Sequence, residues 1–344
     1  MCCPTPHQQH GALVISLDFE LHWGVRDWGP VDRPYRPNLL GARSAVPRIL
    51  ALFAESRVAA TWATVGFLFA RDRGELTDFF PVERPRYRQP RFDPYGERIG
   101  RNENDDPLHF ARSLLERIRQ TPRQEIGSHT FSHYFCLEDG QDVGSFRADL
   151  TSAQRIASAT MGLTLRSLVL PRNQFNPEYS AAIREAGFLC YRGNQRGRIY
   201  QAAGRNADSA GRRALRLADT YIPVSRDRLQ SWHEVPAAAG LGDVRASRFL
   251  RPSSPLFKAL DPWRAGRIVS GMRAAARNAQ IYHLWWHPHN FGAHIDESIQ
   301  FLSRILTEFR DLRNEFGFQS MSMAEAAGQA ASRESPAAVE AGQI

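Results

Sequence analysis

Apolar runs and amphipathic segments alternate along most of this 344-residue chain. The runs are rich in β-branched and aromatic residues, and several end abruptly in polar ones, as buried parallel strands do. They predict strands over residues 12–21, 125–129, 166–171, 188–193 and 281–292, and a strand that runs into a loop or short helix over residues 58–69. Apolar residues at helical spacing lie between them and predict helices over residues 42–56, 108–120, 142–160, 177–187, 261–278 and 296–316. The alternation predicts a parallel α/β fold, either open or closed as a barrel.

Other segments depart from this pattern. Residues 71–107 are dense in Pro, Arg, Asp and Gly, so we interpret them as a loop insertion, because loops of this length are usually functional or disordered. Residues 1–10 and the low-complexity tail 327–344 are predicted to be disordered. Residues 231–238 are predicted to be extended. No linker or fixed repeat divides the remainder, which predicts one domain over residues 11–326.

Composition narrows the class of protein. An apolar content of 42% and a charged content of 23% are typical of a globular protein with a sizeable core. No apolar run is long enough for a transmembrane helix, and the first residues lack the pattern of a secretory signal, so we expect a cytoplasmic protein. The four cysteines have neither the context of a disulfide scaffold nor the spacing of a zinc ribbon.

The net charge of +8 comes almost entirely from arginine, since Lys258 is the only lysine. Such a surplus favours phosphates, nucleic acid or an anionic membrane surface, or it reflects a compositional bias. The arginines are scattered and no nucleic-acid-binding module is recognisable, so no nucleic-acid partner is expected. Peripheral contact with a membrane stays open.

Candidate chemistry lies where the predicted strands end. In a parallel α/β barrel, loops from different strand ends converge, and catalytic groups gather there. The polar residues at these positions are Asp18, Glu20, His129, His133, Arg172, Asn173, Gln174, His287 and His289.

Two histidines and a carboxylate form a common catalytic zinc set with an open position for water. A metal there would activate water and polarise a carbonyl, which suits amide or ester hydrolysis. The spacing of His129 and His133 alone is weak evidence, because residues four apart share a helix face for any reason. A protease of the H-E-x-x-H type is excluded, since Thr130 follows His129.

The ordered motifs resemble those of the polysaccharide deacetylase family, carbohydrate esterase family four. They are 16-SLDFE-20, 60-ATWATVG-66, 125-EIGSHTFSH-133, 169-VLPRNQF-175 and 284-LWWHPH-289. The resemblance spans about residues 12 to 325 and implies a distorted, incomplete (β/α) barrel of the seven-stranded deacetylase type. Where the family commonly has two adjacent aspartates, this chain has Asp18-Phe19-Glu20.

The resemblance also implies a mechanism. A divalent metal, usually zinc, would be held by Glu20, His129 and His133. Metal-bound water would attack an N-acyl group on a sugar, with Asp18 as base and Arg172 orienting Asp18. His287 would protonate the leaving amine, with His289 as the alternative acid.

Further residues near these motifs are candidates for binding the sugar. They are His22, Trp23, Asn173, Gln174, Trp286 and His289. Trp285 and Trp286 are candidates for a stacking wall, although buried aromatic strand residues are the commoner case.

The resulting hypothesis is a metal-dependent hydrolase that removes an acetyl or formyl group from an amino sugar of a glycan or lipid-linked saccharide precursor. Two alternatives stay open. One is a metal-free C–N hydrolase of the same fold that acts on a small cyclic amide or ureide. The other is a non-catalytic glycan-binding barrel.

Overall fold

A curled parallel sheet forms the centre of the computed structural model, which describes residues 10–28, 35–200, 209–222 and 229–334. Its strand order is β6-β5-β4-β3-β2-β1-β8-β7, and β9 also pairs with β1. The strands are β1 (Ala12–Phe19), β2 (Ala60–Thr64), β3 (Gln124–Ser128), β4 (Ser167–Leu168), β5 (Cys190–Tyr191), β6 (Gly242–Asp243), β7 (Arg248–Phe249), β8 (Ile281–Trp286) and β9 (Gln319–Met321). The edge strands β6 and β7 do not pair, so the barrel is incomplete, as predicted.

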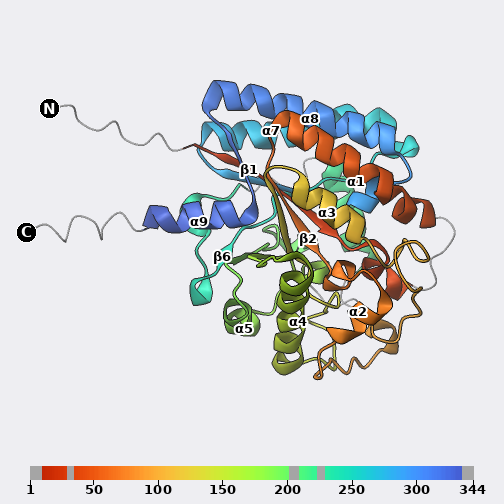
Figure 1. Cartoon of the computed structure of the whole chain (residues 1–344). Helices are drawn as coiled ribbons and strands as arrows, with labels where there is room; N and C mark the ends of the chain where they lie inside the picture. Colours follow the sequence, from red (N-terminus) through yellow and green to blue (C-terminus); the bar gives the residue numbers. More distant parts are fainter. Residues whose placement is uncertain (1–9, 29–34, 201–208, 223–228, 335–344) are drawn as a thin grey trace, which may run out of the picture.

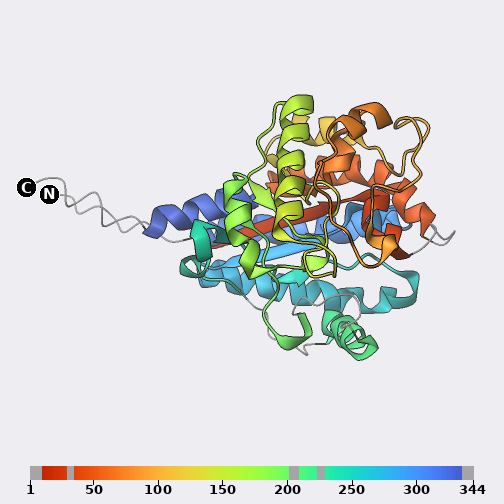
Figure 2. The same cartoon turned by 90° about the horizontal axis from the view of Figure 1, so that it is seen from below.

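Helices flank the sheet, and most of them lie on its outer side (Figures 1 and 2). They are α1 (Arg36–Ser56), α2 (Arg73–Asp78), α3 (Arg112–Gln120), α4 (Val143–Met161), α5 (Ser180–Glu185), α6 (Ala210–Tyr221), α7 (Asp261–Arg277), α8 (Ile295–Phe316) and α9 (Met323–Glu334). Most predicted helices and strands are present, with ends shifted by a few residues. Within the described ranges, no helix has the length and apolarity needed to cross a bilayer.

The side chains of β1 alternate between two faces, one in the main core and the other in the barrel interior, where the site lies. Its residues are buried throughout, because helices cover one face and the barrel interior the other. Leu13, Ile15, Leu17 and Phe19 pack into the main core with the surrounding helices. Ala12 and Val14 belong instead to a second apolar cluster inside the barrel, while Ser16 and Asp18 are polar positions on that same inner face. The interior is therefore apolar at the start of β1 and polar at its carboxyl end.

Helix α9 closes the apolar end of the barrel (Figure 1). Its residues Met323, Ala326 and Ala330 are buried in the interior cluster with Val14. The disorder predicted from residue 327 is therefore wrong as far as Glu334. Small alanines have high helix propensity and fit against the barrel, although their low complexity suggested disorder. The predictions for residues 1–9 and 335–344 lie outside the described residues.

The predicted insertion 71–107 is largely irregular but not loose. It contains α2 and a short 3-10 helix, Pro90–Phe92. Tyr87 and Phe92 pack with Phe135, which follows His133 in the chain. The insertion is therefore packed against the histidine-containing loop. The extended segment predicted at 231–238 is wrong in part, because Trp232–Glu234 form a 3-10 turn.

Candidate metal centre

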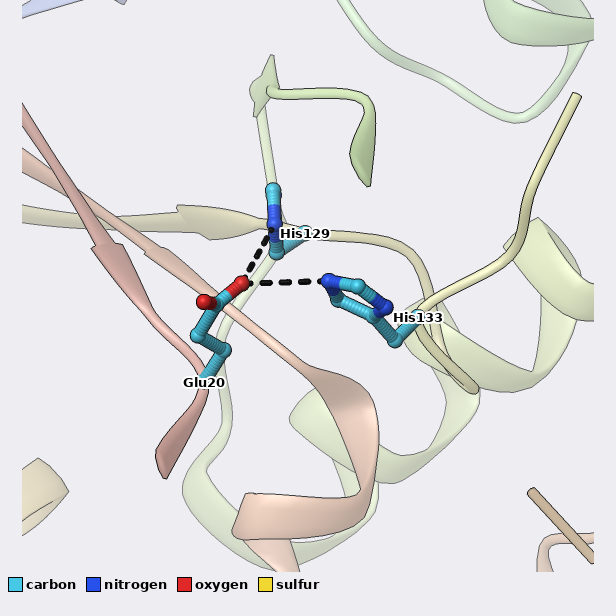
Figure 3. Close-up of side chains that lie close together, drawn as sticks. All are labelled: Glu20, His129 and His133. Carbon is cyan, nitrogen blue, oxygen red and sulfur yellow. Dashed lines mark hydrogen bonds and ion pairs between the residues drawn. The ribbon is translucent and has the colours of Figure 1, made fainter. Parts of the chain in front are cut away.

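Glu20, His129 and His133 meet at one point at the carboxyl ends of the strands (Figure 3). Glu20 Oε2 lies 3.1 Å from His129 Nε2 and 3.1 Å from His133 Nε2. All three side chains are buried, with at most 4% of each residue exposed. The single carboxylate oxygen thus faces both imidazoles, as the sequence led us to expect.

Buried hydrogen bonds support the loop that carries the two histidines. Thr130 and His133 have positive φ angles of 63° and 58°, conformations that cost free energy for residues with a side chain. Asp149 on α4 compensates by accepting hydrogen bonds from the backbone N–H groups of Phe131 and Ser132, at 2.7 and 3.1 Å. Helix α4 therefore holds the loop in a shape that turns both imidazoles toward Glu20.

These three residues fit a divalent metal. His129 Nδ1 lies 2.9 Å from the carbonyl oxygen of Val169 and donates to it, which leaves the lone pair of Nε2 directed at Glu20. Ligand atoms around one tetrahedral zinc ion stand about 3.3 Å apart when each bond is about 2.0 Å. The 3.1 Å separations from Glu20 are close to that spacing.

Electrostatics favour the ligating forms of Glu20 and His133. Burial raises the pKa of Glu20, but the nearby His287 and the contacts with His129 and His133 outweigh it and hold the pKa well below its usual range. Burial lowers the pKa of His133 to about 4, so this imidazole is neutral near pH 7. Arg26 Nη1 lies 3.4 Å from His133 Nδ1, which is too long for a strong hydrogen bond that would fix the tautomer.

Asp18 is held by Arg192 and not by Arg172. Arg192 donates from Nη1 to Asp18 Oδ1 at 2.6 Å and from Nη2 to Oδ2 at 2.8 Å. Burial raises the pKa of Asp18, and the charge of Arg192 is the largest opposing effect; the net pKa is lowered. Arg172 pairs with Asp27 instead. The predicted orientation of Asp18 by Arg172 is therefore wrong, because the turn after β4 points that guanidinium at another carboxylate.

His287 faces both carboxylates. Its Nε2 lies 3.3 Å from Glu20 Oε1 and 3.8 Å from Asp18 Oδ2. About a quarter of its side chain (24%) is exposed, so it lies between the buried acids and solvent. His289 is nearly fully buried, and burial lowers its pKa to about 3, with the neighbouring His287 adding to the shift. A nearly always neutral His289 is the weaker candidate for the acid.

A pocket of about 300 Å³ opens over these groups, at the lower end of the range of ligand-binding pockets. Besides the residues already described, Gly24, Val25, Tyr35, Asn173, Phe249, Trp285 and Asn290 line it. Trp285 and Phe249 form its aromatic side, with ring centroids 4.7 Å apart. Among the predicted sugar-binding residues, Asn173 and His289 line this pocket.

Trp286 does not line the pocket, contrary to the prediction. Successive strand residues point to opposite faces, so Trp285 and His287 share the inner face and Trp286 points outward. Trp286 is fully buried, and its ring centroid lies 6.2 Å from that of Phe53 on α1. It is a core residue.

Gln174, His22 and Trp23 are also absent from the pocket lining. Gln174 is buried and braces another loop, where it donates to Glu138 and accepts from the N–H of Leu137. After Glu20 the chain turns into a 3-10 helix, Leu21–Gly24, which directs His22 and Trp23 toward the 71–107 insertion and the residues that follow it. Their predicted contact with substrate is not supported by this geometry.

Several site residues were missed in the sequence. Arg192 lies in the polar end of the predicted strand 188–193, and the strand-end rule that found Asp18 and His287 applies to it equally. Phe249 lies on the two-residue strand β7, which is too short to recognise from periodicity. Tyr35 precedes α1 and gives no local signal.

Comparison with known proteins adds an independent observation. The sequence model of polysaccharide deacetylases matches residues 32–191, which include His129 and His133. Over these residues the chain is similar to polysaccharide deacetylases. The matched span excludes Asp18, Glu20 and His287, which join the two histidines only in the folded barrel. No curated protein matches the chain.

Solved structures of the polysaccharide deacetylase type are similar to this chain. A putative polysaccharide deacetylase from Mycobacterium smegmatis is 13% identical with a TM-score of 0.60, and the alignment covers 97% of this chain and 95% of that one. This likeness shows the fold. The peptidoglycan deacetylase PdaC from Bacillus subtilis is 10% identical (TM-score 0.42, 96% and 95% covered). A family-four pseudoenzyme from Bacillus anthracis is 11% identical (TM-score 0.44, 93% and 66% covered).

Proposed function

We propose that this protein is a metal-dependent hydrolase that removes an acetyl or formyl group from the nitrogen of an amino sugar. The observation that carries the proposal is that two buried carboxylates in one site have different partners. Glu20 faces both histidines, while Asp18 is bound by Arg192, and His287 faces both acids from the solvent side. A glycan-binding barrel has no need of a base and an acid placed around one pocket.

Glu20, His129 and His133 would hold the cation, with zinc the best match to two imidazoles and a carboxylate. When bound, a divalent cation lowers the pKa of a water molecule and polarises the acyl carbonyl. The chain's own residues supply the remaining chemistry.

Asp18 is suited to accept the proton of the attacking water. Its lowered pKa keeps it ionised near neutral pH, and two hydrogen bonds from Arg192 fix its plane. His287 Nε2 is suited to hold a proton for the leaving amine, because that proton lies within reach of both carboxylates before transfer. The two groups flank the same pocket, so proton removal and proton delivery occur on one bound acyl group.

The pocket favours a sugar. Trp285 and Phe249 offer an apolar face for the ring, and Asn173, Tyr35 and Asn290 offer polar groups for hydroxyls. We propose a lipid-linked or surface-polysaccharide precursor as the substrate class.

Release of acetate and formate from a panel of N-acyl amino sugars, measured with zinc-loaded protein, tests the proposal. We expect release by the wild type and a loss of at least about 10²-fold in Asp18→Asn. Asp296→Asn changes an exposed carboxylate on α8 and serves as the control. Unchanged release in Asp18→Asn would refute the mechanism, and hydrolysis of cyclic amides by metal-free protein would support the metal-free alternative.

A further inference from the structure

A second group of metal-ligating side chains lies outside the pocket. His22, Glu97 and His109 each offer one ligand atom, and these atoms all lie within 4.8 Å of one another. The two imidazole rings are 4.6 Å apart at their centroids and nearly perpendicular, at 78°. None of the three residues lines the pocket described above.

The two histidines of this group carry buried nitrogens that lack partners. His22 and His109 are only 4% and 7% exposed. Within the described part of the chain, His22 Nδ1 and His109 Nε2 have no hydrogen-bond partner. A buried polar atom without a partner costs about 1–3 kcal/mol, so such atoms in a native protein call for a ligand.

The partner of His109 prepares its free nitrogen for a cation. Asp106 Oδ2 lies 2.7 Å from His109 Nδ1 and accepts its proton, which leaves a bare lone pair on Nε2. A carboxylate behind a histidine that offers its other nitrogen is the usual support of a metal-binding imidazole. Glu97 adds an anionic oxygen, 3.7 Å from His22 Nε2. Asp106 and Glu97 together carry two negative charges, which match the charge of a divalent cation.

We infer that His22, Glu97 and His109 form a second metal site, separate from the Glu20 centre. Two imidazoles and one carboxylate favour zinc, with cobalt or nickel as less specific occupants. The side chain of Glu97 is 32% exposed, so a hydrated cation can enter from solvent at this residue. The inference does not depend on the proposed deacylase activity.

A metal there would fasten the insertion to the catalytic strand. Glu97 belongs to the 71–107 insertion, and His22 follows the metal-site acid Glu20 by two residues. Direct contacts already join the chain after Glu20 to the residues that follow the insertion: the N–H of His22 donates to the carbonyl of Leu108, and Trp23 Nε1 donates to the carbonyl of His109. A cation would add bonds that close this junction, in the manner of a structural site.

Counting bound zinc tests the inference. Full-length protein is stripped with a chelator, dialysed against zinc ions and analysed by mass spectrometry for metal per chain. We expect two equivalents in the wild type, one in Glu97→Gln and one in His133→Gln. Glu97→Gln preserves shape at a partly exposed position, so it should fold. Glu83→Gln alters an exposed glutamate of the same insertion and should keep two equivalents.

Thermal unfolding gives a second readout. In the His133→Gln background, where only the second site is intact, zinc should raise Tm, and adding Glu97→Gln should abolish the shift. A wild-type count of one that falls to zero in Glu97→Gln upholds the second site and removes the Glu20 centre. Three results overturn the inference: no bound zinc in the wild type, a single zinc that only His133→Gln removes, or a loss in Glu83→Gln equal to that in Glu97→Gln. A water molecule would then be the partner of His22 Nδ1 and His109 Nε2.

Discussion

Arg192, at the end of β5, binds both carboxylate oxygens of Asp18 on β1, although three strands separate β5 from β1 in the sheet. The contact exists because the sheet curls, which brings strands that are far apart in pairing order face to face across the barrel. Arg192 also donates to Ser16 Oγ at 3.0 Å and to Asn173 Oδ1 at 3.0 Å. Its guanidinium lies over the ring of Trp285, 4.1 Å from the centroid. The position of the candidate base is therefore set by a side chain from the opposite wall.

Replacing Arg192 with Gln should lower kcat by about 10²-fold, the loss expected when a catalytic group is misplaced. Because the charge of Arg192 lowers the pKa of Asp18, its removal should also move the acidic limb of the pH–rate profile to higher pH. Arg192→Lys keeps the charge but loses the paired hydrogen bonds, so kcat should fall with a smaller shift of the limb. Arg172→Gln is the matched control: Arg172 pairs with Asp27 and not with Asp18, so this change should leave the acidic limb in place. A shift of the limb in Arg172→Gln but not in Arg192→Gln would contradict this assignment.

Replacing Glu20 or His133 with Gln should abolish binding of the metal at the catalytic centre. Each variant removes a ligand whose neighbours cannot complete the site, so zinc affinity should fall by more than the 10- to 100-fold that loss of a supporting residue causes. Isothermal titration of stripped protein with zinc measures this affinity. His289→Gln, a change at a buried histidine of the same pocket, should keep it. Full retention of affinity in both ligand variants would exclude this centre.

Replacing His287 with Gln should spare the metal and impair turnover. Loss of a general acid typically costs about 10²- to 10⁴-fold in rate, and the basic limb of the pH–rate profile should disappear with it. Release of the acyl group across pH, with metal content measured on the same samples, separates the two effects. If His289→Gln removes the basic limb and His287→Gln does not, the acid is His289.

Replacing Asp149 with Asn should destabilise the fold by about 1–3 kcal/mol at pH 5, because one of the N–H groups of the histidine loop loses its acceptor. Burial raises the pKa of Asp149 to about 6, above its unfolded value of 3.8. The folded state therefore binds this proton more tightly, and the resulting stabilisation is lost as pH rises from about 4 to 6. The difference in unfolding free energy between wild type and Asp149→Asn should narrow over that range.

Chemical denaturation of metal-free protein at several pH values measures this difference. Asp296→Asn, at an exposed carboxylate, should show no such narrowing. If the difference in unfolding free energy between wild type and Asp149→Asn widens from pH 4 to 6, the pKa of Asp149 is lowered in the folded protein.

Much of the candidate site was predictable from one rule about strands. Asp18, Glu20, His129 and His287 each lie in the polar, carboxyl-terminal part of a predicted parallel strand, and the carboxyl ends of such strands converge. The rule needs only the local strand assignment, which long apolar runs make clear. The same rule applies to Arg192 in the polar end of its strand, so this residue was also predictable from the sequence.

The wrong site assignments concern the direction in which side chains point. Trp285 and Trp286 are chemically identical, and only their register against β1 places one in the pocket and the other in the core. Arg172 and Arg192 both follow strands, but the positive φ of 54° at Arg172 turns its side chain to Asp27. A small change of backbone angle at a turn redirects a long side chain by several ångströms, and sequence pattern does not encode such angles.

The sequence by itself determined the α/β class, the order of most elements and the three residues of the candidate metal centre, because hydrophobic periodicity and residue chemistry are local properties. The tertiary structure decided which arginine holds the base, which tryptophan meets the pocket, and that His22 joins Glu97 and His109 instead of the sugar site. Each of these depends on the curl of the sheet and the packing of the 71–107 insertion. Both arise from contacts between residues far apart in the chain, which no local pattern records.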